Sequence, residues 1–155
     1  MMLVFFDTNI YIATKYIYDR QKFAVLRTLM EKGKVNVLYM SVTEGEVLQH
    51  IREDIGEAVR TYNRALKKEA VFLLEHDNFG ISKIDAESAI ASVEGKFKEF
   101  IDLDSVHIIS LNPLDAEKLM ADYFNQNSPF ESKKPYEFKN AVIINALKQF
   151  QASID

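Results

Sequence analysis

The chain has 155 residues, of which 48% are hydrophobic and 27% charged, and its formal net charge is −4. These values are typical of one soluble globular domain, and the acidic charge argues against a broadly basic nucleic-acid scaffold, although it leaves room for a nuclease whose metal site is acidic. The absence of cysteine excludes disulfides and thiolate metal sites, while the lack of a signal peptide and of an apolar run of ~18 residues predicts a cytoplasmic protein with no membrane partner.

The first predicted elements are two strands with helices between them. A continuous apolar run at residues 2–6 is typical of a strand that helices bury on both faces. Helical spacing follows over residues 10–18, and a second helix over 19–31 is expected to end at the Lys-Gly-Lys of residues 32–34. Residues 35–40 form the second predicted strand.

The rest of the chain is expected to contain mostly helices and one more strand. In order, the predicted elements are helices over residues 43–54 and 55–76, a break at 78–80, a helix over 85–102, a strand over 106–110, a helix over 114–124, a polar loop over 125–135 and a helix over 136–151. Strands that alternate with helices predict parallel pairing and an α/β layered fold.

Three strands make a small sheet, and the sequence stops just after a helix. A fourth strand would be the natural completion, so we expect the sheet to lack its last strand in this chain. The single predicted domain, residues 1–155, would then be C-terminally truncated, or a partner would supply the strand. An incomplete edge also favours association, so a homodimer is a further prediction.

Asp7 is the first candidate site residue, because it follows the first predicted strand directly. In open parallel sheets, ligands bind in the crevice beyond the carboxyl ends of the strands. A carboxylate there can hold a hard cation through oxygen. The alternative is that Asp7 or Asn9 only caps the following helix.

Glu46 is the second candidate, in the first turn of the helix predicted after the second strand. The alternative is a capping box, with Thr43 as N-cap and Glu46 reaching back to it; Ser41 and Glu44 fit the same pattern. His50 lies one turn beyond Glu46, and we expect it on the helix face or on the substrate side.

The third candidate segment covers residues 129–142, a lysine-containing loop followed by Glu-Phe-Lys-Asn-Ala-Val. Pro135 suits the first turn of a helix, and Glu137 would lie near the positive end of the helix dipole. Asn140 lies beside a stripe of inward-facing residues that begins with Phe138. Its alternative interpretation is an ordinary solvated or hydrogen-bonded amide.

These three segments together resemble the PIN domain. Residues 4–10, Val-Phe-Phe-Asp-Thr-Asn-Ile, are similar to the opening strand and D-T-N signature of that family. Residues 41–50 resemble its second motif, in which a Glu opens a helix and a His often follows, and residues 130–141 resemble its third, a Lys-rich loop before Glu-Phe-x-Asp-Ala. The resemblance implies a PIN-like three-layer α/β/α fold around a small parallel sheet.

The resemblance also implies a metal-dependent endoribonuclease, in the setting of a toxin or defence effector. Carboxylates at the sheet edge would bind Mg²⁺ or Mn²⁺, which activates water and neutralises the phosphate under attack. Asp7 would be a direct ligand and Glu46 a second one, with Asn140 as the third catalytic position. Asn9 would orient Asp7 or contact substrate, and Ser41 would help to hold the carboxylates or the substrate.

Two departures from the family pattern bear on activity. Asn140 replaces the Asp of the third motif, so activity is reduced, or Glu137 takes over as a metal ligand, or the residue is a deliberate inactivating substitution. The fourth acidic motif is missing, because no strand precedes Asp155. The alternative function is therefore a catalytically impaired PIN-like module that binds RNA or protein. An unrelated phosphotransfer domain that uses Asp7 is disfavoured by the absence of a glycine-rich phosphate loop.

Three lysines flank the predicted site: Lys133, Lys134 and Lys139. They are expected to hold the backbone of single-stranded or structured RNA as point charges, and the alternative is a merely solvated loop. Tyr11, Tyr16 and Tyr18 could stack on bases, but packing of a helix against the sheet explains them more simply.

Overall fold

The computed structural model describes residues 1–68, 70–74, 80–112, 114–130 and 137–154. Its helices and strands follow one another as β1 (Met2–Phe5), α1 (Thr8–Ala13), α2 (Gln21–Glu31), β2 (Val35–Met40), α3 (Ser41–Lys68), α4 (Val71–Leu74), α5 (Ala86–Ile101), β3 (Val106–Ile109), α6 (Ala116–Phe124) and α7 (Phe138–Ile154). Across these ranges, no helix is both long enough and apolar enough to span a bilayer.

The three strands form one parallel sheet in the order β1-β2-β3, as the alternation of strands and helices predicts. In the register of the sheet, Phe5 lies opposite Leu38, and Met40 lies opposite Ile109. Because all the strands run the same way, their carboxyl ends meet at one edge of the sheet. That edge is where polar residues follow β1 and β2.

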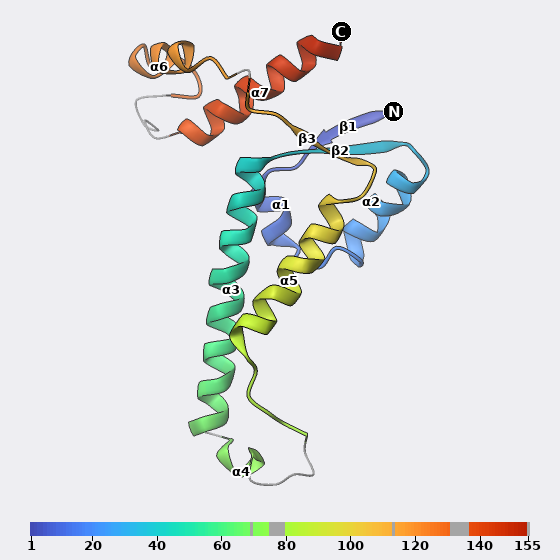
Figure 1. Ribbon diagram of the computed structural model, residues 1–155, viewed down its shortest axis with the longest axis vertical. Helices are drawn as coiled ribbons and strands as arrows, with labels where there is room; N and C mark the ends of the chain where they lie inside the picture. Colours follow the sequence, from blue (N-terminus) through green and yellow to red (C-terminus); the bar gives the residue numbers. More distant parts are fainter. Residues whose placement is uncertain (69, 75–79, 113, 131–136, 155) are drawn as a thin grey trace.

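Helices cover both faces of the sheet, so the fold is a three-layer α/β/α arrangement (Figure 1). Successive side chains of a strand point to opposite faces, and β2 is apolar on both. Val35 and Val37 join the cluster under α1, α2, α3 and α5. Leu38 and Met40 join a second cluster with α7, and α6 packs beside the start of α7. The two-sided burial predicted for the apolar run at residues 2–6 is instead found in β2; the prediction is wrong for the start of β1, where Met2 and Leu3 are exposed because β1 lies at the edge of the sheet.

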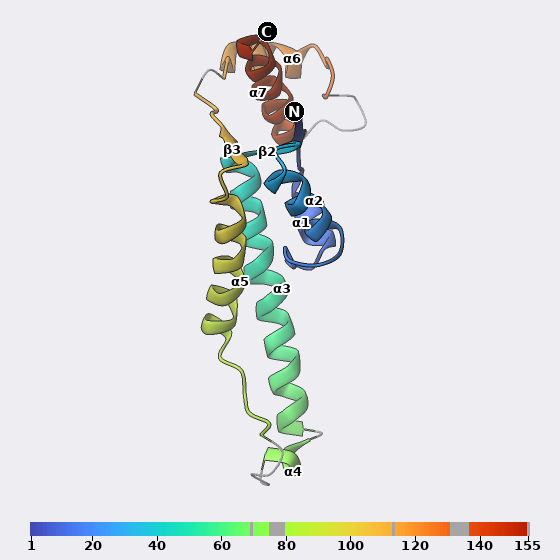
Figure 2. The ribbon, with the colours of Figure 1, turned by 90° about the vertical axis from the view of Figure 1, so that its right-hand side faces the viewer.

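The longest element, α3, corrects the prediction of two separate helices at residues 43–54 and 55–76. It runs unbroken from Ser41 to Lys68, and α5 lies beside it in both views (Figures 1 and 2). The apolar stripe of Val47, Ile51 and Val59 stays buried across Gly56. Packing of this stripe thus outweighs the local cost of a mid-helix glycine.

Beyond Ala86, where α5 begins, the last part of α3 forms a projecting arm together with residues 82–84 (Figures 1 and 2). The Asn63 side chain pairs with the backbone of Ile84, donating to its carbonyl at 2.8 Å and accepting from its amide at 3.0 Å. Tyr62 adds a hydrogen bond from its hydroxyl to the carbonyl of Ser82. These contacts hold the returning chain against α3.

The first helix is shorter than its pattern predicts, because α1 ends at Ala13 rather than near residue 18. Lys15 and Tyr16 have φ angles of 53° and 60°, a left-handed backbone that cannot continue an α-helix. The turn directs Tyr16 and Tyr18 inward, where both are buried together with Tyr11. Because these three tyrosines are buried, they pack in the core and are not accessible for stacking on bases.

Candidate active site

The candidate site lies at the carboxyl edge of the sheet, where the two layers of helices meet. Asp7 comes two residues after the end of β1, and Glu46 lies in the second turn of α3, which begins directly after β2. Lys139 and Asn140 belong to the first turn of α7, and Glu137 immediately precedes it. Parallel strand ends are the usual position of ligand sites in open α/β sheets.

Asp7 occupies the N-cap position of α1 by its backbone, but its side chain makes no capping hydrogen bond. The interpretation of this carboxylate as a helix cap is therefore wrong. Asn9 Nδ2 donates to Asp7 Oδ2 at 3.0 Å, so the amide orients the carboxylate. With 41% of its surface exposed, the Asp7 side chain is accessible to a ligand.

Glu46 is not part of a capping box, because α3 begins at Ser41 and Thr43 lies inside the helix. The Thr43 hydroxyl is buried and has no hydrogen-bond partner in the described part of the chain. Glu46 Oε2 instead accepts from Thr8 Oγ1 at 2.5 Å and from Lys139 Nζ at 3.1 Å. Thr8, which is only 4% exposed, was not predicted as a site residue, although it stands in the D-T-N motif.

Lys139 links the two candidate carboxylates. Its Nζ is 3.1 Å from Glu46 Oε2 and 3.9 Å from Asp7 Oδ1, and the Lys139 side chain is 36% exposed. The lysine expected to flank the cleft therefore lies on the carboxylates themselves. Partial exposure weakens each ion pair through solvent screening, so the contacts describe position better than stability.

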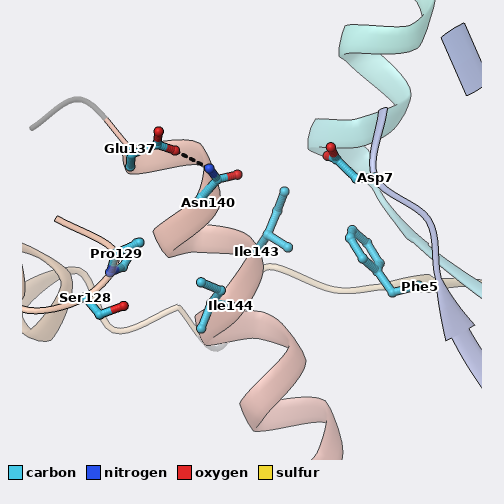
Figure 3. Close-up of a pocket in the computed structure, with 8 residues that line it drawn as sticks. All are labelled: Phe5, Asp7, Ser128, Pro129, Glu137, Asn140, Ile143 and Ile144. Atoms are coloured by element: carbon cyan, nitrogen blue, oxygen red, sulfur yellow. Dashed lines mark hydrogen bonds between the residues drawn. The ribbon is translucent and has the colours of Figure 1, made fainter. Parts of the chain in front are cut away.

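Asp7 also borders an open cavity of about 340 Å³ between the sheet edge and α7 (Figure 3). Asn140 on α7 and Glu137 just before it lie across the cavity from Asp7, and Ile143 lies between Asn140 and Asp7 in the view. The Asn140 amide nitrogen donates to Glu137 Oε2. The full lining consists of Phe5, Asp7, Ser128, Pro129, Glu137, Asn140, Ile143 and Ile144. Ser128, Ile143 and Ile144 lie outside the three predicted motifs.

The predicted site residues thus form two neighbouring groups that share Asp7. One group is Asp7, Glu46 and Lys139, and the other is Asp7, Glu137 and Asn140. No three acidic or histidine side chains, of those that the structure describes, are grouped so as to hold one metal ion. The two groups nevertheless supply carboxylate and amide oxygens, the donors that Mg²⁺ and Mn²⁺ prefer.

The other predicted residues take different places. Ser41 is the exposed first residue of α3, and His50 lies on the face of α3 with its Nδ1 3.9 Å from Glu53 Oε2. Lys133 and Lys134 lie outside the described residues. The predicted contacts of Ser41 and His50 with substrate stay predictions.

The family model of the PIN domain matches residues 4–153. The chain belongs to the PIN domain family. PIN domains are generally nucleases, which typically bind nucleic acid and use divalent metal ions. The match takes in β1 and nearly all of α7, so every candidate site residue of this PIN domain falls within it. No curated protein and no solved structure matches the chain significantly.

Proposed function

We propose that this PIN domain is a metal-dependent endoribonuclease, with Asp7 and Glu46 as ligands of Mg²⁺ or Mn²⁺. The observation that carries the proposal is the shared contact of both carboxylates with one positive atom, Lys139 Nζ. Two carboxylates from separate segments that reach one cationic group are arranged to share a cation. Their oxygens suit a hard divalent ion.

Beside Asp7 and Glu46 lie further oxygen donors, one of which is an uncharged amide and therefore a weaker metal ligand. Asn140 offers an amide oxygen, and Glu137 a carboxylate, on the far wall of the cavity that Asp7 borders. A bound divalent ion would lower the pKa of a coordinated water and neutralise charge on the phosphate. We propose that Asp7 and Glu46 hold one such ion, and that Asn140 and Glu137 supply donors for a second one beside Asp7.

The remaining residues of the site position these groups or bind the RNA. Asn9 holds Asp7 through its amide, and Thr8 holds Glu46 through its hydroxyl. We assign phosphate contacts to Lys133, Lys134 and Lys139, and a substrate-side position to Ser41. The cavity beside Asp7 has a volume at the lower end of the small-molecule range, which suits one nucleotide of a single-stranded or structured RNA.

Asn140 favours a second candidate function, a PIN-like module that binds RNA or a protein partner without cutting. Its side chain carries no charge, and its amide nitrogen is hydrogen-bonded to Glu137. A site with an amide in place of a carboxylate binds a divalent ion more weakly, because it lacks one negative charge. The two functions differ only in whether a phosphodiester bond is broken.

Cleavage of labelled RNA in Mn²⁺ or Mg²⁺ tests the proposal. We expect cleavage that stops with chelator and falls by at least ~100-fold in Asp7→Asn, because the ligand loses its charge. Asp104→Asn is the matched control, since Asp104 lies exposed in the turn before β3, at the opposite edge of the sheet. Cleavage that survives in Asp7→Asn would refute the assigned site.

Asn140→Asp separates the two candidate functions. Activity that appears only in this variant identifies the chain as an impaired nuclease. Absence of RNA cleavage by both forms refutes the enzyme. Induced expression of the chain, with Asp7→Asn as control, tests the toxin or defence setting through growth arrest. The cytoplasmic location and the homodimer or sheet-completing partner stay predictions.

A further inference from the structure

Lys139 lies between the two carboxylates that we propose as metal ligands. Its ammonium contacts Glu46 Oε2 and approaches Asp7 Oδ1, the two groups proposed above to share a metal ion. We propose that Lys139 is an internal cation that competes with the divalent metal for Asp7 and Glu46. The inference rests on the proposed function only for the identity of these two ligands.

The charges at the site explain why a nearby cation is favourable there. Two carboxylates that converge on one point repel each other, and a shared positive charge offsets that repulsion. In the part of the chain that the structure describes, Lys139 is the only residue in a salt bridge with either Asp7 or Glu46. Lys139 is therefore placed to offset the repulsion between the two ligands.

The contact with Glu46 makes the competition direct. Glu46 Oε2 accepts from both Thr8 and Lys139, so both lone pairs of this oxygen are engaged. The Thr8 hydroxyl belongs to a buried residue at the start of α1, whereas the Lys139 ammonium ends a flexible stem that is partly exposed. The lysine is thus the partner that can leave when a metal arrives.

The location of Lys139 in its helix supports a role of this kind. It is the second residue of α7, where the helix dipole disfavours a positive charge. A lysine at that position gains little for the helix itself, so its favourable contacts are those with the two carboxylates. Binding of a divalent ion would cancel them, and metal affinity would be lower than the ligands alone allow.

Binding of Mn²⁺ to the purified protein, followed by the paramagnetic resonance of the free ion, tests the competition. Lys139→Met should bind Mn²⁺ about tenfold more tightly than the unchanged protein, because the competing charge is gone. Lys148→Met is the matched control, since Lys148 lies further along α7 and does not line the cavity of Figure 3. Lys139→Arg keeps the charge and should show no such gain.

Several outcomes would overturn the competition. The first is that Lys139→Met binds Mn²⁺ no more tightly than the unchanged protein. This includes the case in which neither protein binds Mn²⁺. The second is that Lys139→Met and Lys139→Arg gain the same affinity for Mn²⁺, because packing rather than charge would then control that affinity. Thermal unfolding in chelator checks that each variant is folded.

A second measurement needs no variant. Saturating Mg²⁺ should increase the reaction of Lys139 with an amine-directed acetylating reagent, read by mass spectrometry, because the amine leaves the carboxylates. Lys148 should react equally with and without Mg²⁺. Unchanged or reduced labelling of Lys139 would contradict the proposal.

These readouts do not depend on RNA cleavage. If Lys139→Met gains affinity for Mn²⁺ while no RNA is cut, the nuclease proposal fails and the competition stands. If RNA is cut and Lys139→Met shows no gain, the competition fails and the nuclease proposal stands.

Discussion

The segment from Phe6 to Tyr11 contributes to two regions that are built in opposite ways. On one side lies a cluster of packed rings, Phe6, Tyr11, Tyr18, Phe23, Phe97 and Phe100, in which the centroids of contacting pairs are 5.2–6.4 Å apart. On the other side lies the partly exposed group of Asp7, Glu46 and Lys139. One region is held by many apolar contacts, and the other by a few polar ones.

The difference shows how stability and chemistry are divided in this PIN domain. Tyr11 packs α1 against the other rings. Thr8, in the same helix, donates to Glu46, and Asp7 is the residue immediately before the helix. The ring cluster therefore positions α1 and, through Thr8, the site. Substitutions in the cluster should change the free energy of unfolding, and substitutions in the site should change metal binding.

Phe97→Ala tests the ring cluster most strongly. Phe97 is 1% exposed and contacts both Tyr11 and Tyr18, so its loss should lower the free energy of unfolding by ~3–5 kcal/mol, measured by urea denaturation. Phe124→Ala is the control, because Phe124 is 73% exposed. Equal losses in the two variants would mean that the rings are not the main source of stability on this face.

Thr8→Val tests the boundary between the two regions. Valine keeps the shape of the buried side chain but removes the donor to Glu46, so Mn²⁺ affinity and RNA cleavage should fall about tenfold. The free energy of unfolding should change by only ~1 kcal/mol. Thr43→Val is a matched control, because the Thr43 hydroxyl is buried without a hydrogen-bond partner among the described residues. A site that binds Mn²⁺ unchanged in Thr8→Val would show that Glu46 needs no support from α1.

Tyr11→Phe should have the smallest effect. Burial, with a smaller contribution from nearby Tyr39, raises the pKa of the Tyr11 phenol above its ordinary value, so the group is neutral at pH 7. Its hydroxyl has no hydrogen-bond partner within the described ranges, so its removal should leave the free energy of unfolding unchanged or raise it by up to ~1 kcal/mol.

Tyr16→Phe is the contrast to Tyr11→Phe. The Tyr16 hydroxyl donates to Asp54 at 2.7 Å, and its loss should cost ~1 kcal/mol in the same denaturation experiment. A larger cost for Tyr11→Phe than for Tyr16→Phe would reveal a partner for the Tyr11 hydroxyl, such as a buried water.

Local patterns predict the parts of this fold that depend on neighbours in sequence. The bounds of β2 are as predicted, because an apolar run lies between a glycine turn and a polar helix start. The prediction of two helices over α3 is wrong, since Glu53, Asp54 and Gly56 obscure an apolar stripe that becomes clear only when it packs against α5. Tertiary packing decides that element.

The same distinction applies to the site. Asp7 and Glu46 are predictable because each follows a strand of a parallel sheet and belongs to a family motif. The contact of Lys139 with Glu46 is not, because it joins residues 93 positions apart and depends on how α7 crosses the sheet edge. The burial of the Thr43 hydroxyl and the bond from Thr8 depend likewise on where α3 begins.

The unbroken course of α3 has a mechanical consequence. Its 28 residues give a rod ~42 Å long, with Glu46 ~8 Å from the end at the sheet. Val47, Ile51 and Val59 are buried along the part nearer the sheet, so packing anchors that part of the rod, while the far end projects beyond α5 (Figure 1). One continuous helix thus carries a candidate ligand near its anchored end and a mostly exposed surface at its projecting end.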